Sequence, residues 1–127
     1  MHKTELRSYI NCMRKGLRIC PTSIKLHMFH SRDIFGNLLS CCPRAHAVLG
    51  FFGKDIRPDG NVFERVEPTF LHTQKVLRFG YNVSADGNDP LFSHQEFTLA
   101  EAINELSGRY KWMTEQVIEW LESHLND

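Results

Sequence analysis

The sequence predicts a single α+β domain, spanning residues 1–127, in which N-terminal and C-terminal helices cover an antiparallel sheet of about four strands. Both ends of the chain carry apolar residues at steps of three and four, the period of a helix. Between them lie short apolar or alternating segments, separated by turn-forming sequences such as RPDG and SADGNDP. A chain of 127 residues fits one domain, and helices at both ends of a group of strands favour a layered α+β fold.

The first expected element is a helix over residues 4–17. Pro21 prevents this helix from continuing past Cys20, because the residue before a proline avoids the helical conformation. The apolar residues at helical spacing, which would face the sheet, are Leu6, Tyr9, Ile10, Met13 and Leu17. The basic residues aligned on another face are Lys3, Arg7, Arg14 and Arg18.

The middle of the chain predicts four strands and one short helix. Residues 23–30 alternate between apolar and polar side chains, which indicates a strand with one apolar face. Ser31 can cap a short helix over residues 33–40, and Pro43 then breaks the chain. Residues 46–52 (HAVLGFF) are an apolar run of strand length, interpreted as a central strand. Residues 61–67 and 74–83 alternate again and predict two further strands, the first of which ends at Pro68.

The longest periodic segment is residues 98–127, which predict the C-terminal helices. Thr98 and Glu101 have the spacing of a capping box, in which each side chain accepts a hydrogen bond from the other's backbone N–H. After Gly108, the apolar residues on one helical face are Tyr110, Met113, Val117, Leu121 and Leu125. The residues Glu115, Glu119 and Glu122 form a second, acidic face.

The formal net charge is zero, but the charges are unevenly distributed along the chain. Residues 1–60 contain ten basic and four acidic residues, whereas the remainder contains five basic and eleven acidic ones. This asymmetry can reflect nucleic-acid binding by one half, contact between the halves, or association of copies. The N-terminus (MHKTELRSYINCMRKG) has no apolar core typical of a secretory signal, and no run of about eighteen apolar residues occurs. We therefore expect a cytoplasmic protein without a membrane span, whose four cysteines are free thiols.

No motif that is specific for catalysis or cofactor binding occurs in the chain. It contains no GxSxG, Walker A, GxGxxG or HExxH sequence, so we expect no cofactor, assign no catalytic residue and favour a protein that is not an enzyme. Glu64, Glu67, His72 and His94 are candidates for acid–base chemistry only because they are titratable. Cys41 and Cys42 follow a predicted helix rather than begin one, which does not favour a reactive thiolate.

A group of histidines and cysteines has the spacing of a zinc site but lacks the paired elements that make such a site specific. The candidate ligands are His27, His30, Cys42 and His46, with Cys41 beside them. Strong zinc motifs use CxxC pairs, and none occurs here. The preferred interpretation is that the cysteines fill core space as small apolar groups and that the histidines lie near the surface.

The leading hypothesis is a small binding protein that acts through a protein–protein interface, such as an inhibitor, an immunity-type protein or an adaptor, with a homodimer as one form of the interface. Its expected surface is the C-terminal helix, because tryptophan with a charged rim is typical of binding hot spots. The residues of this surface are Trp112, Glu115, Glu119, Trp120 and Glu122.

Two alternatives remain. The first is a nucleic-acid-binding protein that uses Lys3, Arg7, Arg14 and Arg18, since several cations on one surface attract phosphates. The second is a small-ligand-binding domain or enzyme with a pocket between the sheet and the helices, which would hold two or more of His27, His46, His72 and His94. The acidic face of the C-terminal helix can also pair with the basic face of the first helix, within one chain or between two copies.

Overall fold

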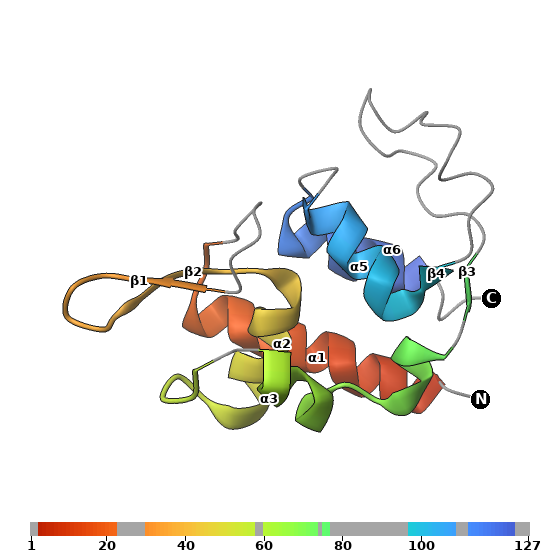
Figure 1. Ribbon diagram of the computed structural model, residues 1–127, viewed down its shortest axis with the longest axis horizontal. Coiled ribbons are helices and arrows are strands. Elements are labelled where there is room, and N and C mark those ends of the chain that lie inside the picture. Colours follow the sequence, from red (N-terminus) through yellow and green to blue (C-terminus); the bar gives the residue numbers. More distant parts are fainter. Residues whose placement is uncertain are drawn as a thin grey trace.

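The computed structural model describes residues 3–22, 30–57, 60–73, 75–76, 97–108 and 112–123. In this part of the chain the fold is mixed α and β and mostly helical (Figure 1). The helices are α1 (Lys3–Ile19), α2 (Pro43–Phe52), α3 (Gly60–Val66), the 3-10 turn η1 (Thr69–His72), α5 (Leu99–Gly108) and α6 (Thr114–Ser123). The strands are β1 (His30–Arg32), β2 (Leu38–Cys41), β3 (Lys75–Val76) and β4 (Phe97–Thr98).

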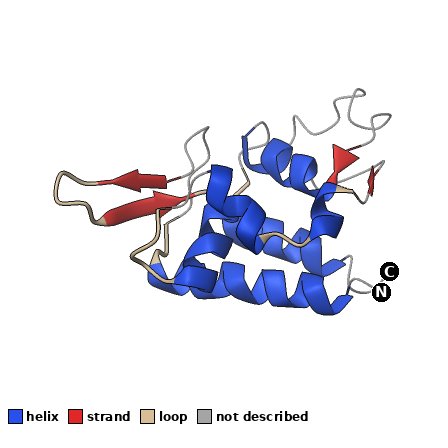
Figure 2. Cartoon of the chain, turned by 60° about the horizontal axis from the view of Figure 1, so that its bottom comes forward, coloured by secondary structure: helices blue, strands red, loops and turns tan. Residues whose placement is uncertain are grey.

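The predicted single sheet of about four strands is not confirmed. Among the described residues, β1 pairs with β2 and β3 pairs with β4, giving two separate antiparallel ladders of two strands each. They lie at opposite ends of a helical body in both views (Figures 1 and 2). The predicted strand over residues 23–30 lies outside the described residues apart from His30, and that over 74–83 lies outside them apart from β3.

Helix α1 confirms the predicted N-terminal helix. Its stripe of Leu6, Tyr9, Ile10 and Met13 is buried, as the helical spacing of these residues predicts. The helix ends at Ile19, and the Cys20 backbone N–H still donates to the Gly16 carbonyl at 2.8 Å. The helix therefore ends two residues before Pro21.

Helix α2 corrects the prediction of a central strand over residues 46–52. Pro43 occupies the first turn, and the Cys42 thiol caps the helix by accepting a hydrogen bond from the Ala45 N–H at 3.4 Å. Most of the helix is buried, including Ala47 and Leu49. A helix surrounded by other elements has no polar face, so its sequence lacks the helical period and resembles a buried strand.

Two glycines allow α1 and α2 to cross with their backbones in contact. A side chain at Gly16 would overlap the carbonyl of His46, and one at Gly50 would overlap the carbonyl of Cys12. The pairing of 16 with 46 and of 12 with 50 makes the two helices antiparallel at this crossing. Helix α1 packs more extensively against α2 than against any other element described.

Two further predictions are wrong. Residues 33–40, predicted to be a short helix, form the turn of the β1–β2 hairpin and most of β2. Residues 61–66 of the predicted strand over 61–67 belong to α3, and Glu67 follows the helix directly, with its N–H donating to the Phe63 carbonyl at 2.9 Å. Phe63 and Glu67 are both buried. Alternation over a few residues is also compatible with a helix whose buried stripe is narrow, and here tertiary contacts select the helix.

The C-terminal helices confirm the capping-box prediction. The Thr98 N–H donates to Glu101 Oε1 at 3.0 Å, and the Glu101 N–H donates to Thr98 Oγ1 at 3.1 Å. Helix α5 begins at the next residue. Helix α6 begins at Thr114, and directly before it the Met113 N–H donates to the Gln116 side-chain oxygen at 2.8 Å.

The core is formed mainly by helices. One cluster joins α1, α5 and α6, and a second gathers Cys20, Cys41 and Phe63 around α2. Helix α2 contributes Ala47 to the first cluster and Leu49 to the second, so it lies between them. None of the helices in the described ranges combines the length and the apolar character that crossing a membrane requires.

Candidate functional site

The turn of the β1–β2 hairpin is held by the Asp33 carboxylate. Asp33 Oδ1 accepts hydrogen bonds from the N–H groups of Phe35 (2.8 Å) and Asn37 (2.9 Å), and these bonds and their neighbours lower the pKa of Asp33. Gly36 has a φ of 85°, a conformation that side-chain-bearing residues rarely adopt. The turn is thus built by its own residues and does not depend on contact with the helical body.

This ordered turn presents large apolar side chains to solvent. Ile34 is 94% exposed and Phe35 is 82% exposed, and Leu39 is also exposed. The strand register passes from Ser31–Ser40 to Arg32–Leu38 and skips Leu39, which marks a bulge. The hairpin projects from the helical body in both views (Figures 1 and 2), so its turn, which contains Ile34 and Phe35, lies at the far end of a protrusion.

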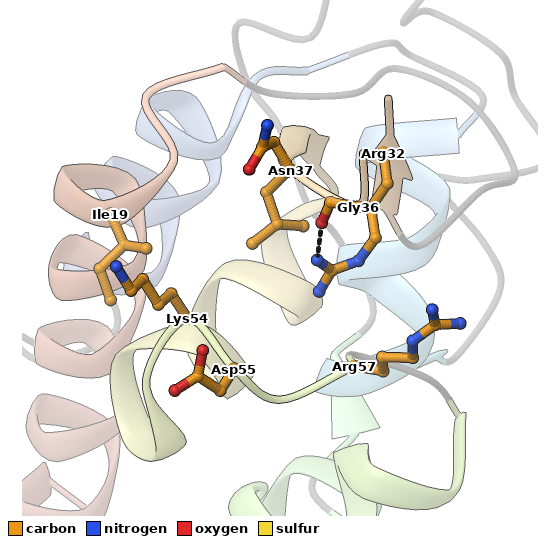
Figure 3. A pocket seen from close by; sticks show the side chains of 8 residues that line it. Ile19, Arg32, Gly36, Asn37, Lys54, Asp55 and Arg57 are labelled. Atoms are coloured by element: carbon orange, nitrogen blue, oxygen red, sulfur yellow. Dashed lines mark hydrogen bonds between the residues drawn. The ribbon is translucent and has the colours of Figure 1, made fainter. Parts of the chain in front are cut away.

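A basic cleft lies at the base of the hairpin (Figure 3). Its volume is about 500 Å³, and it is lined by the end of α1, the hairpin and the segment after α2. Arg32 Nη1 donates to the Gly36 carbonyl at 2.5 Å and Nη2 donates to the Ile56 carbonyl at 3.2 Å, which ties the hairpin to that segment. With Arg32, Lys54 and Arg57 against the single carboxylate of Asp55, the lining has an excess of positive charge.

The surface predicted on the C-terminal helix is only partly available. Trp112 is 8% exposed and belongs to the core, and Trp120 packs against the same cluster with part of its side chain accessible. Glu115 and Glu119 are exposed on α6. Glu122 forms an ion pair with Arg14 at 2.7 Å. The two tryptophans therefore offer a partner less surface than the glutamates do.

The basic face predicted on the first helix is exposed. Lys3, Arg7, Arg14 and Arg18 all lie on the solvent side of α1. The Arg14–Glu122 ion pair joins α1 to α6 within one chain. At this ion pair the acidic and basic faces meet within one chain, which is one of the two arrangements that the charge pattern predicts.

Among the acid–base candidates, Glu67 and His72 lie together, whereas Glu64 is exposed on α3 and His94 lies outside the described residues. The Glu67 side chain is 1% exposed and accepts two hydrogen bonds from Arg44, at 2.5 and 2.6 Å. His72 Nε2 lies 2.9 Å from the second carboxylate oxygen, and the Tyr9 hydroxyl donates to the first at 3.2 Å.

This carboxylate therefore has a complete set of partners from α1, α2 and η1. Burial and the nearby Glu67 charge raise the pKa of Tyr9, so its phenol stays protonated and donates to Glu67. Burial opposes the charge of Arg44, but its hydrogen bonds with Glu67 outweigh that effect and raise its pKa. The Arg44 guanidinium also lies 4.6 Å from the centre of the Phe63 ring. The arrangement is that of an ion pair that holds elements together.

Within the described ranges, the structure does not bring the predicted zinc ligands together as one group. His46 is buried in α2 and His30 lies in β1, but the Cys42 thiol is occupied as the cap of α2, and His27 lies outside the described residues. The side chains that gather around His46 are those of Cys20 and Cys41. Cys20 is separated by more than twenty residues from both, so spacing along the chain does not reveal it.

The exposed residues of the hairpin are also missing from the predicted sites. Ile34 and Phe35 are apolar residues of the kind that fill a core, and they lie in the segment over residues 33–40 that was predicted to be a short helix. The signal that could have identified the turn is the sequence DIFGN, since aspartate and glycine at these positions favour a tight turn over a helix.

Comparison of the chain with protein-family models, with curated proteins and with solved structures finds no match. The functional inferences that follow therefore depend on the residues of this chain alone.

Proposed function

We propose that this protein acts by binding another protein and that the β1–β2 hairpin supplies the anchoring residues. The observation that carries this proposal is the pair Ile34 and Phe35, almost fully exposed at the end of a protruding hairpin. Burying a side chain of this size in a partner contributes about 1.5–3 kcal/mol. Exposed apolar groups that are gathered on a protruding element are typical of interaction sites.

The turn is suited to binding because its conformation is already ordered. Asp33 holds the backbone at Phe35 and Asn37, so a partner need not order the loop when it binds. Preorganisation of this kind lowers the entropic cost of association. The mechanism is steric: the hairpin inserts two apolar side chains into a recess on the partner, as expected of an inhibitor, an immunity-type protein or an adaptor.

The basic cleft indicates the chemistry of the partner. Arg32, Lys54 and Arg57 lie behind the apolar tip and outnumber the one acidic residue, Asp55. A partner that accepts the tip is therefore expected to carry acidic residues beside its apolar recess, because complementary charges speed association and fix its orientation. A partner with these properties is a protein surface or an acidic peptide segment.

Site-specific photo-crosslinking tests the proposal. A photoreactive phenylalanine analogue is placed at Phe35, and as a matched control at exposed Glu119 on α6, and the protein is crosslinked in extracts of its source cells. We expect Phe35 to yield a defined protein adduct that is absent from the control. Crosslinks from position 119 alone would move the interface to the C-terminal helix, and the absence of adducts at both positions would argue against a protein partner.

Charge substitution at the tip measures its contribution. Ile34→Asp and Phe35→Asp change fully exposed positions, so the free energy of unfolding of the isolated protein is expected to stay within about 0.5 kcal/mol of wild type. The affinity for the crosslinked partner is expected to fall at least about tenfold for each substitution. Light scattering on the same variants separates a different partner from a second copy of this chain, because only self-association would change the wild-type mass.

Nucleic-acid binding by α1 is the alternative proposal, and the exposure of Lys3, Arg7, Arg14 and Arg18 on one helix favours it. The charge-reversal variant Arg7→Glu with Arg18→Glu leaves the Arg14–Glu122 ion pair in place. If this alternative holds, binding to DNA or RNA falls steeply with salt and is lost in the double variant. Nucleic-acid binding that changes neither with salt nor in the double variant would exclude this alternative.

A further inference from the structure

Three buried side chains with metal-binding atoms meet beneath the hairpin. Cys20 follows α1, Cys41 ends β2 and His46 lies in α2, and they are 3%, 0% and 0% exposed. Their ligand atoms, the two sulfurs and an imidazole nitrogen, all lie within 4.8 Å of one another. The Cys41 N–H also donates to the Thr22 carbonyl at 3.1 Å, which fixes the end of β2 against the segment after α1.

We propose that Cys20, Cys41 and His46 form a structural zinc site. Two thiolates and one imidazole are the ligand types that zinc prefers, and in a tetrahedral site such atoms lie about 3.6–3.8 Å apart. The present separations exceed this by at most about 1 Å, a distance that side-chain rotation covers. A site made from these three residues would join three elements that are distant in the sequence.

His30 is our candidate for the fourth ligand. It is the direct cross-strand partner of Cys41 in the β1–β2 ladder. Residues that face each other in an antiparallel ladder project their side chains to the same side of the sheet. His30 and Cys41 therefore project from the same face of the hairpin. The His30 ring nitrogens are not among the ligand atoms that lie within 4.8 Å of one another, so the ring would have to turn toward the site to complete a Cys2His2 set.

Hydrogen bonds to both ring nitrogens hold His46 in place beside the two thiols. Its Nδ1 lies 2.7 Å from Thr114 Oγ1, and its Nε2 lies 2.8 Å from the Cys20 carbonyl oxygen. Because a carbonyl oxygen only accepts, Nε2–H donates to Cys20 and Nδ1 accepts from the Thr114 hydroxyl in this structure. Coordination through Nε2 requires the other tautomer, in which the ring proton lies on Nδ1 and donates to Thr114 Oγ1, and the metal replaces the contact with the Cys20 carbonyl. A hydrogen bond that fixes the second ring nitrogen is a general feature of histidine ligands. Burial lowers the pKa of His46, so the ring is neutral, as a ligand must be.

Metal binding would give the buried thiols of Cys20 and Cys41 a role as ligands. Burial raises the pKa of Cys41, so without a cation its sulfur stays protonated at neutral pH. On binding, Zn²⁺ forms two Zn–S bonds, and the Cys20 and Cys41 thiols release two protons to solvent. The net charge of the site therefore stays at zero, because the two thiolate charges balance the charge of the metal ion. Cys42 takes no part, because its sulfur caps α2.

Metal analysis of the purified protein, with titration of the reduced, metal-free chain, tests the proposal. We expect one equivalent of zinc, and we expect Co²⁺ to give the visible bands of a tetrahedral site together with a thiolate-to-cobalt charge-transfer band. Adding zinc should raise the melting temperature. A folded, fully reduced wild-type protein that binds neither metal would overturn the proposal, as would a Cys20–Cys41 disulfide in protein purified without oxidant.

Variants locate the metal. Cys20→Ser and Cys41→Ser are expected to lose the charge-transfer band or weaken zinc binding more than about 100-fold, whereas the matched control Cys42→Ser retains it, since serine can also cap a helix. Retention of the cobalt spectrum by both Cys20→Ser and Cys41→Ser would place the metal elsewhere. Should these variants fail to fold by circular dichroism, the wild-type titration still decides the outcome.

Thr114 is a positioning residue in this proposal. Thr114→Val removes the group that orients His46 and leaves the metal ligands in place, so zinc affinity is expected to fall about 10–100-fold with the cobalt spectrum still tetrahedral. A purely structural role for Thr114 would lower stability to the same extent with and without zinc. Equal zinc affinity in wild type and Thr114→Val would contradict the assigned orientation of His46.

Discussion

At the scale of single residues, Glu67 has the most consequential environment in the described chain. Its carboxylate is buried and receives hydrogen bonds from Arg44 and Tyr9, with His72 beside it. Each partner comes from a different helical element, so one side chain links α1, α2 and η1. The sequence identifies Glu67 only as a carboxylate on a polar face, because its partners are distant along the chain.

Replacing Glu67 by glutamine is expected to lower the free energy of unfolding by about 3–5 kcal/mol, because the largely buried Arg44 charge then lacks its counter-ion. Urea denaturation followed by circular dichroism measures the change. Glu64→Gln is the matched control, because Glu64 lies on the exposed side of α3, the helix that Glu67 directly follows; this substitution is expected to change stability by less than about 0.5 kcal/mol. Equal effects of the two substitutions would show that the ion pair contributes little.

His46 predicts a pH dependence of stability. Burial lowers its pKa, while the Cys20 carbonyl and Glu115 partly oppose that shift, so the unfolded chain binds a proton more readily than the folded one. The stabilisation is complete above the unfolded pKa of about 6.5 and is lost as the pH falls toward the folded value. Urea denaturation in the presence of a chelator is expected to show lower stability at pH 5.5 than at pH 7. A pH profile that is identical in His46→Gln would contradict this assignment.

At the scale of elements, the contact between α1 and α2 decides the architecture. Gly16 and Gly50 bring the two backbones together, an approach that no other residue type permits at these positions. Neither glycine stands out in the sequence: Gly16 only weakens the last turn of a predicted helix, and Gly50 lies within a predicted strand. Their role depends on the partner helix.

Gly16→Ala and Gly50→Ala are each expected to destabilise the protein by about 3 kcal/mol or more, because the added methyl group forces the helices apart. Gly108→Ala is the control, since a side chain there meets no atom and alanine favours the helix. It is expected to be neutral or stabilising by up to about 1 kcal/mol. Thermal or urea denaturation of the three variants measures the difference, and comparable stability for all three would contradict the close crossing.

Two of the errors in the predicted elements have one physical cause. Residues 46–52 and 61–67 have short apolar patterns that fit either a strand or a buried helix, and the choice between them is made by packing. In contrast, α1 and α5 have long amphipathic patterns or local caps, such as the Thr98–Glu101 pair, that act without the rest of the fold. These elements are confirmed.

At the scale of the whole molecule, α2 connects the two core clusters, and Val66 packs against both. The acidic and basic halves meet at Arg14 and Glu122, whose side chains are each about two-fifths exposed. An ion pair that exposed contributes a few tenths of a kcal/mol, so it orients α6 on α1 more than it stabilises the fold. The apolar clusters provide most of the stability.

This shared core predicts that the chain unfolds as one cooperative unit. Tryptophan fluorescence reports Trp112 and Trp120 in and beside α6, and far-ultraviolet circular dichroism reports all helices. We expect urea transitions from the two signals to coincide, with a free energy of unfolding on the order of 10 kcal/mol. Separate midpoints would show that the two clusters unfold independently and would contradict the prediction of a single domain.

The sequence by itself determined the mixed α and β class, the terminal helices, and the capping box, because these depend on periodicity and on groups within a few residues of one another. The tertiary structure alone decided that residues 46–52 are a helix, that Gly16 and Gly50 are points of backbone contact, and that Ile34 and Phe35 are exposed. It also brought Cys20 and Cys41 to His46. These features arise from contacts between residues far apart in the chain, which local patterns do not encode.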